Sequence, residues 1–205
     1  MTVTQRAPRV PQEERTRAMR ARLLEACVEV LAENGWAGTS TTVVSQRAGV
    51  SRGAQLHHFP SKSALVLAAV EHLMQVRREE LAAAAAGLPA EGGRRTRAVL
   101  ELFADHFTSP IFAAALELWV AARTDDELLA VVAPLEQHVG RETHRLAVEM
   151  LAADESRPGV RELVQATLDL VRGLGLAATL GDDTGRRGRI LDQWALTLDR
   201  ALEAA

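Results

Sequence analysis

Residues 40–62, STTVVSQRAGVSRGAQLHHFPSK, constrain the fold more than any other part of the chain, because they predict two short helices joined by one glycine. Thr41 and Thr42 offer hydroxyl groups that cap the start of the first helix. Gly49 ends that helix, since glycine enters the left-handed region of backbone space without strain. Ser51 then caps the second helix. This order of signals predicts a helix-turn-helix.

The second of these helices, at about residues 52–59, is predicted to be polar on its outer face. Arg52 and Gln55 are expected to point outward, whereas Leu56 and Phe59 are expected to point inward. Arginine and glutamine side chains pair bidentately with guanine and adenine edges in the major groove of DNA. Arg52 and Gln55 are therefore the predicted base-reading residues.

Small and basic neighbours complete the predicted DNA-contacting surface. Gly53 and Ala54 are small enough to let the helix backbone approach DNA closely. Lys62 is the only lysine of the chain and stands where the next helix begins, so its charge and the amide groups there both favour a phosphate. The predicted contacts are Thr41, Thr42, Arg52, Gly53, Ala54, Gln55, His57, His58 and Lys62.

The run AGVSRGAQLHHFPSK resembles the DNA-binding segment of the tetracycline-repressor (TetR) family of bacterial regulators. The resemblance covers about residues 13–75, and the remainder of the chain is similar only in size and helicity. It implies a homodimer of all-helical subunits with a variable ligand-binding core. It also implies repression that is usually lifted by a small molecule.

The sequence departs from the family pattern late in the second helix, where the family usually has leucine followed by tyrosine. This chain has Gln55 followed by Leu56, and it contains no tyrosine. One interpretation is that His57 takes over the usual aromatic phosphate contact while Leu56 packs inward. The other, which we favour, is that the helix is slightly rotated and Gln55 reads a base.

Charge is distributed unevenly along the chain. Residues 1–62 hold nine Arg or Lys against five Glu, a net charge of +4, whereas the whole chain carries −3. A basic segment gains DNA affinity by releasing phosphate counterions, and an acidic remainder is kept off the duplex. Residues 1–12 are expected to be disordered, and Arg6 and Arg9 resemble basic arms that reach a minor groove or phosphates. A solvated tail is the alternative.

The rest of the chain is also predicted to be helical, because its apolar residues show helical spacing and no alternating strand pattern. Glycine and proline residues at about 87–93 mark a break. We therefore expect an all-α protein of about nine helices. Its parts are a disordered basic arm at 1–12, a helix-turn-helix DNA-binding domain at 13–61, a connecting helix at 62–86, and a ligand-binding and dimerisation domain at 94–205.

One of the later helices has a clear predicted start. Thr124 and Glu127 form a capping box, and the helix that they begin is expected to reach Ala153. Pro134 lies inside it, where one backbone hydrogen-bond donor is lost, so a kink is expected there. A kinked helix leaves room for a cavity in this half of the chain.

The last two predicted helices, at about residues 158–180 and 184–204, are apolar around much of their circumference and are the predicted dimer surface. Packing them against their copies gives a four-helix bundle with twofold symmetry. Such a dimer reads a pseudo-palindromic operator if its two reading helices stand about 34 Å apart. The predicted interface residues are Val164, Leu168, Val171, Gly175, Leu176, Trp194 and Leu198.

A ligand pocket is predicted in the C-terminal half, where most aromatic residues outside the helix-turn-helix gather. Apolar pockets with a few polar groups are typical of small-molecule sites, although an aromatic stripe is also typical of an ordinary core. The predicted pocket residues are Phe103, His106, Phe107, Phe112, Trp119, His144 and Arg172. A ligand that fits only one position of the connecting helix would favour the dimer conformations with one particular distance between the two DNA-reading helices.

Several other classes of function lack their sequence signals. The chain has no glycine-rich phosphate loop, no HExxH pair and no GxSxG motif, so an enzyme is not expected. His138 and His144 are six residues apart and Cys27 is the single cysteine, which argues against a metal site. We expect a cytoplasmic, cofactor-free DNA-binding regulator. The alternative is a helical small-molecule-binding dimer that does not read DNA.

Overall fold

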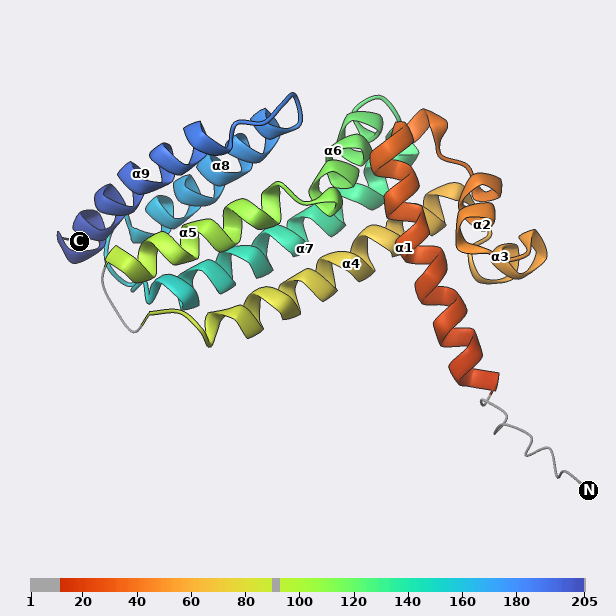
Figure 1. Cartoon of the computed structure of the whole chain (residues 1–205), viewed down its shortest axis with the longest axis horizontal. Coiled ribbons are helices and arrows are strands. Elements are labelled where there is room, and N and C mark those ends of the chain that lie inside the picture. The colour runs from red at the N-terminus through yellow and green to blue at the C-terminus, as the bar shows by residue number, and fades with distance from the viewer. Residues whose placement is uncertain (1–11, 90–92, 205) are drawn as a thin grey trace, which may run out of the picture.

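The computed structural model of the chain describes residues 12–89 and 93–204, which form nine helices and no strand. The helices are α1 Gln12–Gly38, α2 Thr41–Ala48, α3 Arg52–His58, α4 Lys62–Ala85, α5 Gly93–Phe107, α6 Pro110–Ala122, α7 Asp126–Leu151, α8 Val160–Ala178 and α9 Thr184–Ala204. Figure 1 shows α1, α2 and α3 at one end, α8 and α9 at the other, and α4 running between them. The expected all-α fold is confirmed, while Arg6 and Arg9 of the predicted arm lie outside the described residues.

The two short helices are capped by serines. The Ser40 hydroxyl accepts a hydrogen bond of 3.2 Å from the backbone three residues later and begins α2. Thr41 and Thr42 lie inside the first turn, which corrects the prediction that they are the caps. Gly49 ends α2 in the left-handed conformation, at φ 63° and ψ 36°, as predicted. Ser51 begins α3 in the same way as Ser40, with a hydrogen bond of 3.3 Å.

The N-terminal helices are fixed to the rest of the protein through the end of α1. One core cluster contains buried residues of α1, α2, α4, α6 and the start of α7. Gly35 turns the chain at φ 64°, and the Trp36 backbone N–H donates to the Glu117 carboxylate of α6 over 3.4 Å. On the outer side, Arg47 of α2 forms ion pairs with two glutamates of α1. Helix α3 therefore packs on α2, and α2 packs on α1, which in turn packs on α4 and α6.

Helix α7 starts one residue later than predicted. The Asp125 side chain accepts a hydrogen bond of 3.0 Å from the Leu128 backbone N–H, so Asp125 is the cap in place of Thr124. The Thr124 hydroxyl instead donates to the Ala121 carbonyl at the end of α6. Pro134 lies inside α7, and the helix continues past it to Leu151.

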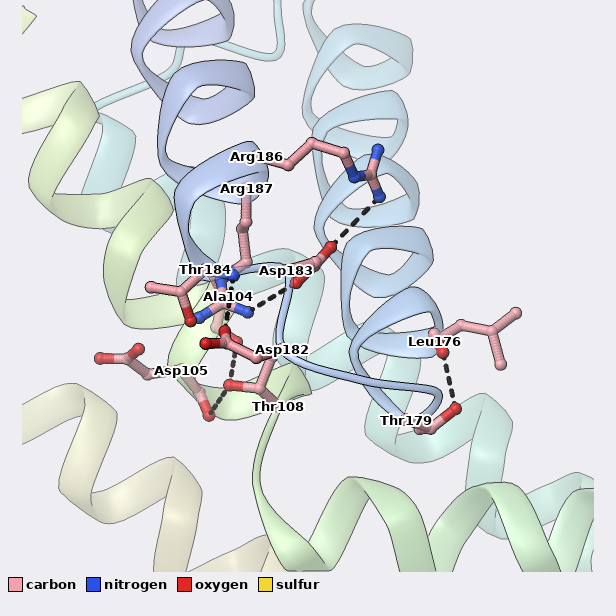
Figure 2. Close-up of polar contacts among 10 residues, drawn as sticks. All are labelled: Ala104, Asp105, Thr108, Leu176, Thr179, Asp182, Asp183, Thr184, Arg186 and Arg187. Carbon is pink, nitrogen blue, oxygen red and sulfur yellow. Dashed lines mark hydrogen bonds and ion pairs between the residues drawn. The ribbon is translucent and has the colours of Figure 1, made fainter.

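The C-terminal helices α5, α7, α8 and α9 share a second core cluster. Figure 2 shows the turn between α8 and α9, in which Asp183 accepts hydrogen bonds from Arg186 and Arg187 over 3.2 and 3.1 Å. The Asp182 carboxylate accepts from the Thr184 backbone N–H over 2.9 Å. These bonds hold the turn closed while Leu180, just before it, is 93% exposed.

Within the described ranges, no single helix combines the length and apolar character that crossing a membrane requires. The pair Arg94–Phe107 and Pro110–Ala122 meets the criterion of length and composition only when taken together, and it is bent by 57°.

Candidate nucleic-acid interface and ligand cavity

The reading helix α3 presents a small outer face. Arg52, Gly53, Leu56 and His57 are exposed, and Leu56 has 43% of its surface accessible. Among the described residues, Arg52 has no hydrogen bond or ion pair. An arginine and a histidine stand here beside a glycine, which lets the backbone come close to a partner. This is the arrangement that major-groove reading requires.

Gln55 lies on the opposite side of α3, which corrects the prediction that it reads a base. Its side chain is fully buried, and its Nε2 atom donates to the Phe59 carbonyl oxygen over 2.7 Å. Phe59 has an extended backbone, with φ −137°, at the end of the helix. Its carbonyl oxygen therefore has no partner within the helix, and the Gln55 side chain supplies the hydrogen bond. Leu56 consequently faces outward, so both arrangements considered from the sequence are wrong at these two positions.

Replacing Gln55 with leucine is expected to lower the free energy of unfolding by about 1 kcal/mol, because the buried Phe59 carbonyl loses its hydrogen bond. The Gln55 Oε1 atom is buried without a hydrogen-bond partner, so removing it recovers part of this loss. Urea unfolding measures the change. Gln46→Leu on the exposed side of α2 is the matched control and should stay within about 0.5 kcal/mol of the parent. A Gln55→Leu protein more stable than the parent would show that removing the unpaired Oε1 atom outweighs the loss of the bond to Phe59.

Lys62 is held by the protein and does not stand free, which corrects the expected phosphate contact. Its Nζ atom lies 3.9 Å from the centre of the Trp36 ring and donates to the Trp36 carbonyl oxygen. Burial lowers the pKa of Lys62. The side chain ties the start of α4 to the end of α1.

The other predicted DNA-contacting residues all lie on α2 and α3. Thr42 and His57 are exposed, whereas Thr41, Ala54 and His58 are half-buried. The exposed predicted set is therefore Thr42, Arg52, Gly53 and His57. Leu56 was not predicted from the sequence as a surface residue. Positions 55 and 56 lie four and three residues before Phe59, so either of them can share its inward face, and this spacing is the one signal in the sequence.

Arg20 of α1 links the region behind the reading helix to the interior. Its guanidinium carbon lies 5.1 Å from the centre of the Phe59 ring, and Phe59 is buried. The same arginine lines a cavity of about 320 Å³ that lies among α1, α4 and α7. Its apolar wall is formed by Leu24, Ala68, Met74, Leu81, Leu135, Val139 and Leu146.

The polar wall of this cavity comes mainly from α4 and α7. It consists of Arg20, Glu71, His72, Gln75, Arg78, His106, His138, Glu142 and Thr143. Arg78 and Glu142 form an ion pair of 2.7 Å that joins α4 to α7. Although three histidines line this space, no group of three metal-ligating side chains forms within residues 12–89 and 93–204.

A narrow chamber of about 60 Å³ adjoins the larger cavity, and the two share Met74, His106, Val139 and Thr143 as lining residues. Five of the seven predicted pocket residues line the chamber, namely His106, Phe107, Phe112, Trp119 and Arg172. The other two do not. Phe103 is buried in the second core cluster, and His144 is bonded to Glu155 over 2.7 Å.

Burial dominates the electrostatics of the narrow chamber. It lowers the pKa of His106 to about 4, and the positive charges of Arg77 and Arg172 act in the same direction. Burial also raises the pKa of the Glu136 carboxyl, against a smaller lowering by the nearby Trp119 N–H and by the charge of Arg172. The Trp119 N–H approaches this carboxyl without completing a hydrogen bond. His106 is therefore a neutral imidazole near pH 7.

Most of the residues predicted at the dimer interface are instead packed inside the subunit, which corrects the predicted interface. Val164, Leu168, Val171 and Leu198 are buried in the second core cluster, and Gly175 packs against the Phe107 backbone. Only Leu176 is exposed, while Trp194 is half-buried and donates to the Thr167 hydroxyl over 3.1 Å. Apolar character alone did not distinguish the inner from the outer faces of α8 and α9.

The sequence matches the model of a family described as bacterial regulatory proteins, tetR family, over residues 23–69. It is 32% identical over 185 residues to the HTH-type transcriptional regulator CymR of Pseudomonas putida, covering 87% of this chain and 88% of CymR. The chain belongs to the TetR family. Its matched segment runs from α1 through the reading helix into α4, the helices described above.

Further TetR-family likeness extends over most of the chain. The HTH-type regulator BetI of Paraburkholderia xenovorans is 27% identical over 170 residues, covering 80% of this chain and 83% of BetI. A crystal structure of a transcriptional regulator from Pseudomonas aeruginosa PAO1 superposes with a TM-score of 0.70 at 25% identity, covering 94% and 93% of the two chains. This TetR-family protein is thus a DNA-binding transcriptional regulator, and its relatives are regulators, not enzymes.

Proposed function

We propose that this protein is a homodimeric repressor that binds a pseudo-palindromic operator through α3. A small molecule in the cavity among α1, α4 and α7 releases it. Helices α1–α3 form the DNA-binding domain, α4 connects it to the interior, and α5–α9 form the ligand-binding and dimerisation domain.

The observation that carries this proposal is the position of the cavity between two parts of the protein. Arg20 and Leu24 line it from α1, which supports the reading helix, while Leu135 and Val139 line it from α7. A ligand here contacts both sides, so it binds unequally to conformations in which the two sides differ in separation. Its effect on operator affinity is limited to that difference in binding energy.

The outer face of α8 supports the proposed dimer. Apolar and small residues recur there every three or four positions and are exposed or half-buried, as a helix seam between subunits requires. They are Leu163, Ala166, Leu170, Gly173 and Ala177, and Leu180 follows just beyond the end of α8. A Cβ atom at Gly173 would meet nothing within 4 Å, so the subunit itself does not require glycine at this position. A second copy packed closely on this face accounts for it.

Titrating a labelled DNA fragment from upstream of the gene at two salt concentrations tests the proposal. A sequence-specific reader loses affinity steeply with salt yet keeps its preference for one site. Footprinting should show two half-sites about one helical turn apart, and sedimentation should show a dimer. A stable monomer, or binding without sequence preference, would instead favour a helical ligand-binding protein that does not read DNA.

Arg52→Ala is expected to weaken operator binding by about 1–3 kcal/mol and to relax the preference at one base position in each half-site. The exposed guanidinium at the start of α3 is the group placed to reach a guanine edge. Binding to a set of single-base operator variants measures both effects. Arg161→Ala removes the same charge from the exposed start of α8 and is the control. A uniform loss across all variants would make Arg52 a phosphate contact.

A further inference from the structure

The narrow chamber contains an unusual number of polar atoms without partners. Five buried side-chain atoms lack a hydrogen bond in the described part of the chain, and three of them belong to chamber-lining residues. These are Trp119 Nε1, Arg172 Nε and His106 Nδ1. A buried polar atom destabilises the fold if nothing occupies its bonding direction. Their gathering around one chamber indicates a binding site for a polar group.

The donor chemistry of these atoms defines what they bind. The Trp119 and Arg172 atoms carry N–H groups and can only donate, so they require an acceptor from the ligand. His106 is neutral near pH 7 and can donate or accept. Glu136 offers an acceptor on the same wall, and the Trp119 N–H lies near it without completing a hydrogen bond. An oxygen atom that accepts two hydrogen bonds, and can donate one, satisfies this set.

Charge balance in the chamber disfavours a charged ligand group. Arg172 and Glu136 line the same small space and carry opposite charges when both are ionised. Arg172 is further paired with Asp169 on the outer side over 2.6 Å. A carboxylate or a quaternary ammonium would bring a further charge into a buried site where Arg172 already faces two carboxyl groups, and it would lose its hydration.

The different sizes of the two spaces indicate a ligand with a small head group and a larger body. A chamber of about 60 Å³ has room for roughly two water molecules, and therefore for a head of two or three atoms. The adjoining cavity of about 320 Å³ is lined by leucine, valine and methionine side chains and suits a compact apolar body. Met74 and His106 line both spaces.

We propose that the effector is a small uncharged molecule with a compact apolar body and one hydroxyl or carbonyl head. The head lies in the narrow chamber and accepts hydrogen bonds from Trp119 Nε1 and Arg172 Nε. The body fills the larger cavity against α1, α4 and α7. This inference rests on the proposed function in taking the cavity as the effector site, and it adds the chemical class of the effector.

Three probes with one apolar body test the head group. Calorimetric titration of the full chain with para-tert-butylphenol, para-tert-butylbenzoate and the para-tert-butylphenyl trimethylammonium ion compares a hydroxyl with an anion and a cation. The phenol is expected to bind at least about tenfold more tightly than either ion. Equal or tighter binding of either ion, or no binding of the phenol at millimolar concentration, would overturn the proposal.

Two variants test the donors. Trp119→Phe keeps the ring but removes the N–H and should weaken phenol binding about fivefold, the worth of one hydrogen bond. Arg172→Met removes the second donor, keeps an apolar chain and should weaken binding at least as much. Trp194→Phe is the matched control, because the Trp194 N–H already donates to Thr167 and lies outside the chamber. Unchanged phenol affinity in Trp119→Phe would contradict the assigned head position.

Operator release is measured separately from ligand binding, so the proposed ligand class and the proposed repressor mechanism can be tested independently. If the phenol binds with the expected selectivity but does not release operator DNA, the ligand class stands and the repressor mechanism fails. If operator binding is specific but the phenol does not bind, the ligand class fails and operator recognition stands.

Discussion

Gly175→Ala is expected to lower the free energy of unfolding by about 3 kcal/mol or more. A Cβ atom on Gly175 would lie 2.2 Å from the carbonyl oxygen of Phe107 and 2.9 Å from its carbonyl carbon. These are backbone atoms at the end of α5, so no side-chain rotation relieves the overlap. The helices α5 and α8 would have to separate, and they hold much of the second core cluster between them.

Gly188→Ala in α9 is the matched control for this prediction. Nothing lies within 4 Å of a Cβ atom there, and alanine favours a helix over glycine by roughly 1 kcal/mol, so stability should rise slightly. Urea unfolding followed by circular dichroism measures both variants at one protein concentration, because the stability of a dimer depends on concentration. Equal stability of the two variants would mean that α5 and α8 are not packed as closely as described.

The second large effect concerns pH. Burial, with Arg77 and Arg172, lowers the pKa of His106 from 6.5 to about 4 in the folded protein. The unfolded chain therefore binds a proton at this histidine between pH 6.5 and about 4, whereas the folded chain does not. The neutral histidine contributes its full stability above pH 6.5 and loses it as the pH falls through this window. The loss amounts to about 3 kcal/mol by pH 4.

His106→Gln is expected to remove this part of the pH dependence while keeping a polar side chain in the chamber. Carboxylates with lowered pKa, such as Glu33 and Glu155, also cost stability in acid, but they are common to both proteins. The measurement is therefore the difference in unfolding free energy between parent and variant at several values of pH from 7.5 to 4. That difference should fall steadily below pH 6.5. A constant difference would show that His106 titrates alike in both states.

The sequence predicted the helices well because their signals are local. Caps, glycine stops and apolar spacing act over a few residues, and they placed α2, α3 and the later helices close to where the structure has them. The caps themselves moved by one residue, from Thr41 to Ser40 and from Thr124 to Asp125. Neighbouring residues with similar capping ability compete, and the backbone conformation of each decides the outcome.

The orientation of side chains around a helix was predicted less well. Gln55 and Leu56 are four and three residues from Phe59, so either can share its inward face. Hydrophobicity favoured Leu56, but the free carbonyl of Phe59 selects the glutamine. On α8, one apolar face packs on α5 and another stays exposed. Which face is which depends on contacts distant in sequence.

The larger cavity shows a limit of a different kind. The aromatic residues indicated the narrow chamber, yet the wider space is lined by α1, α4 and α7, whose residues have no shared motif. Arg20 illustrates this. As one of several arginines near the start of α1, it resembles an ordinary solvated residue, and only the folded arrangement brings it to both the cavity and Phe59.

Arg20 contacts Phe59 and also lines the larger cavity, and these two contacts restrict how this regulator can evolve. Under the proposed function, a substitution there that changes effector binding also alters the contact with Phe59, which follows α3. Effector choice and operator affinity would then change together at this position. Descendants that acquire new inducers without losing their operators should change the residues of α6 and α8 around the narrow chamber, and should conserve the arginine.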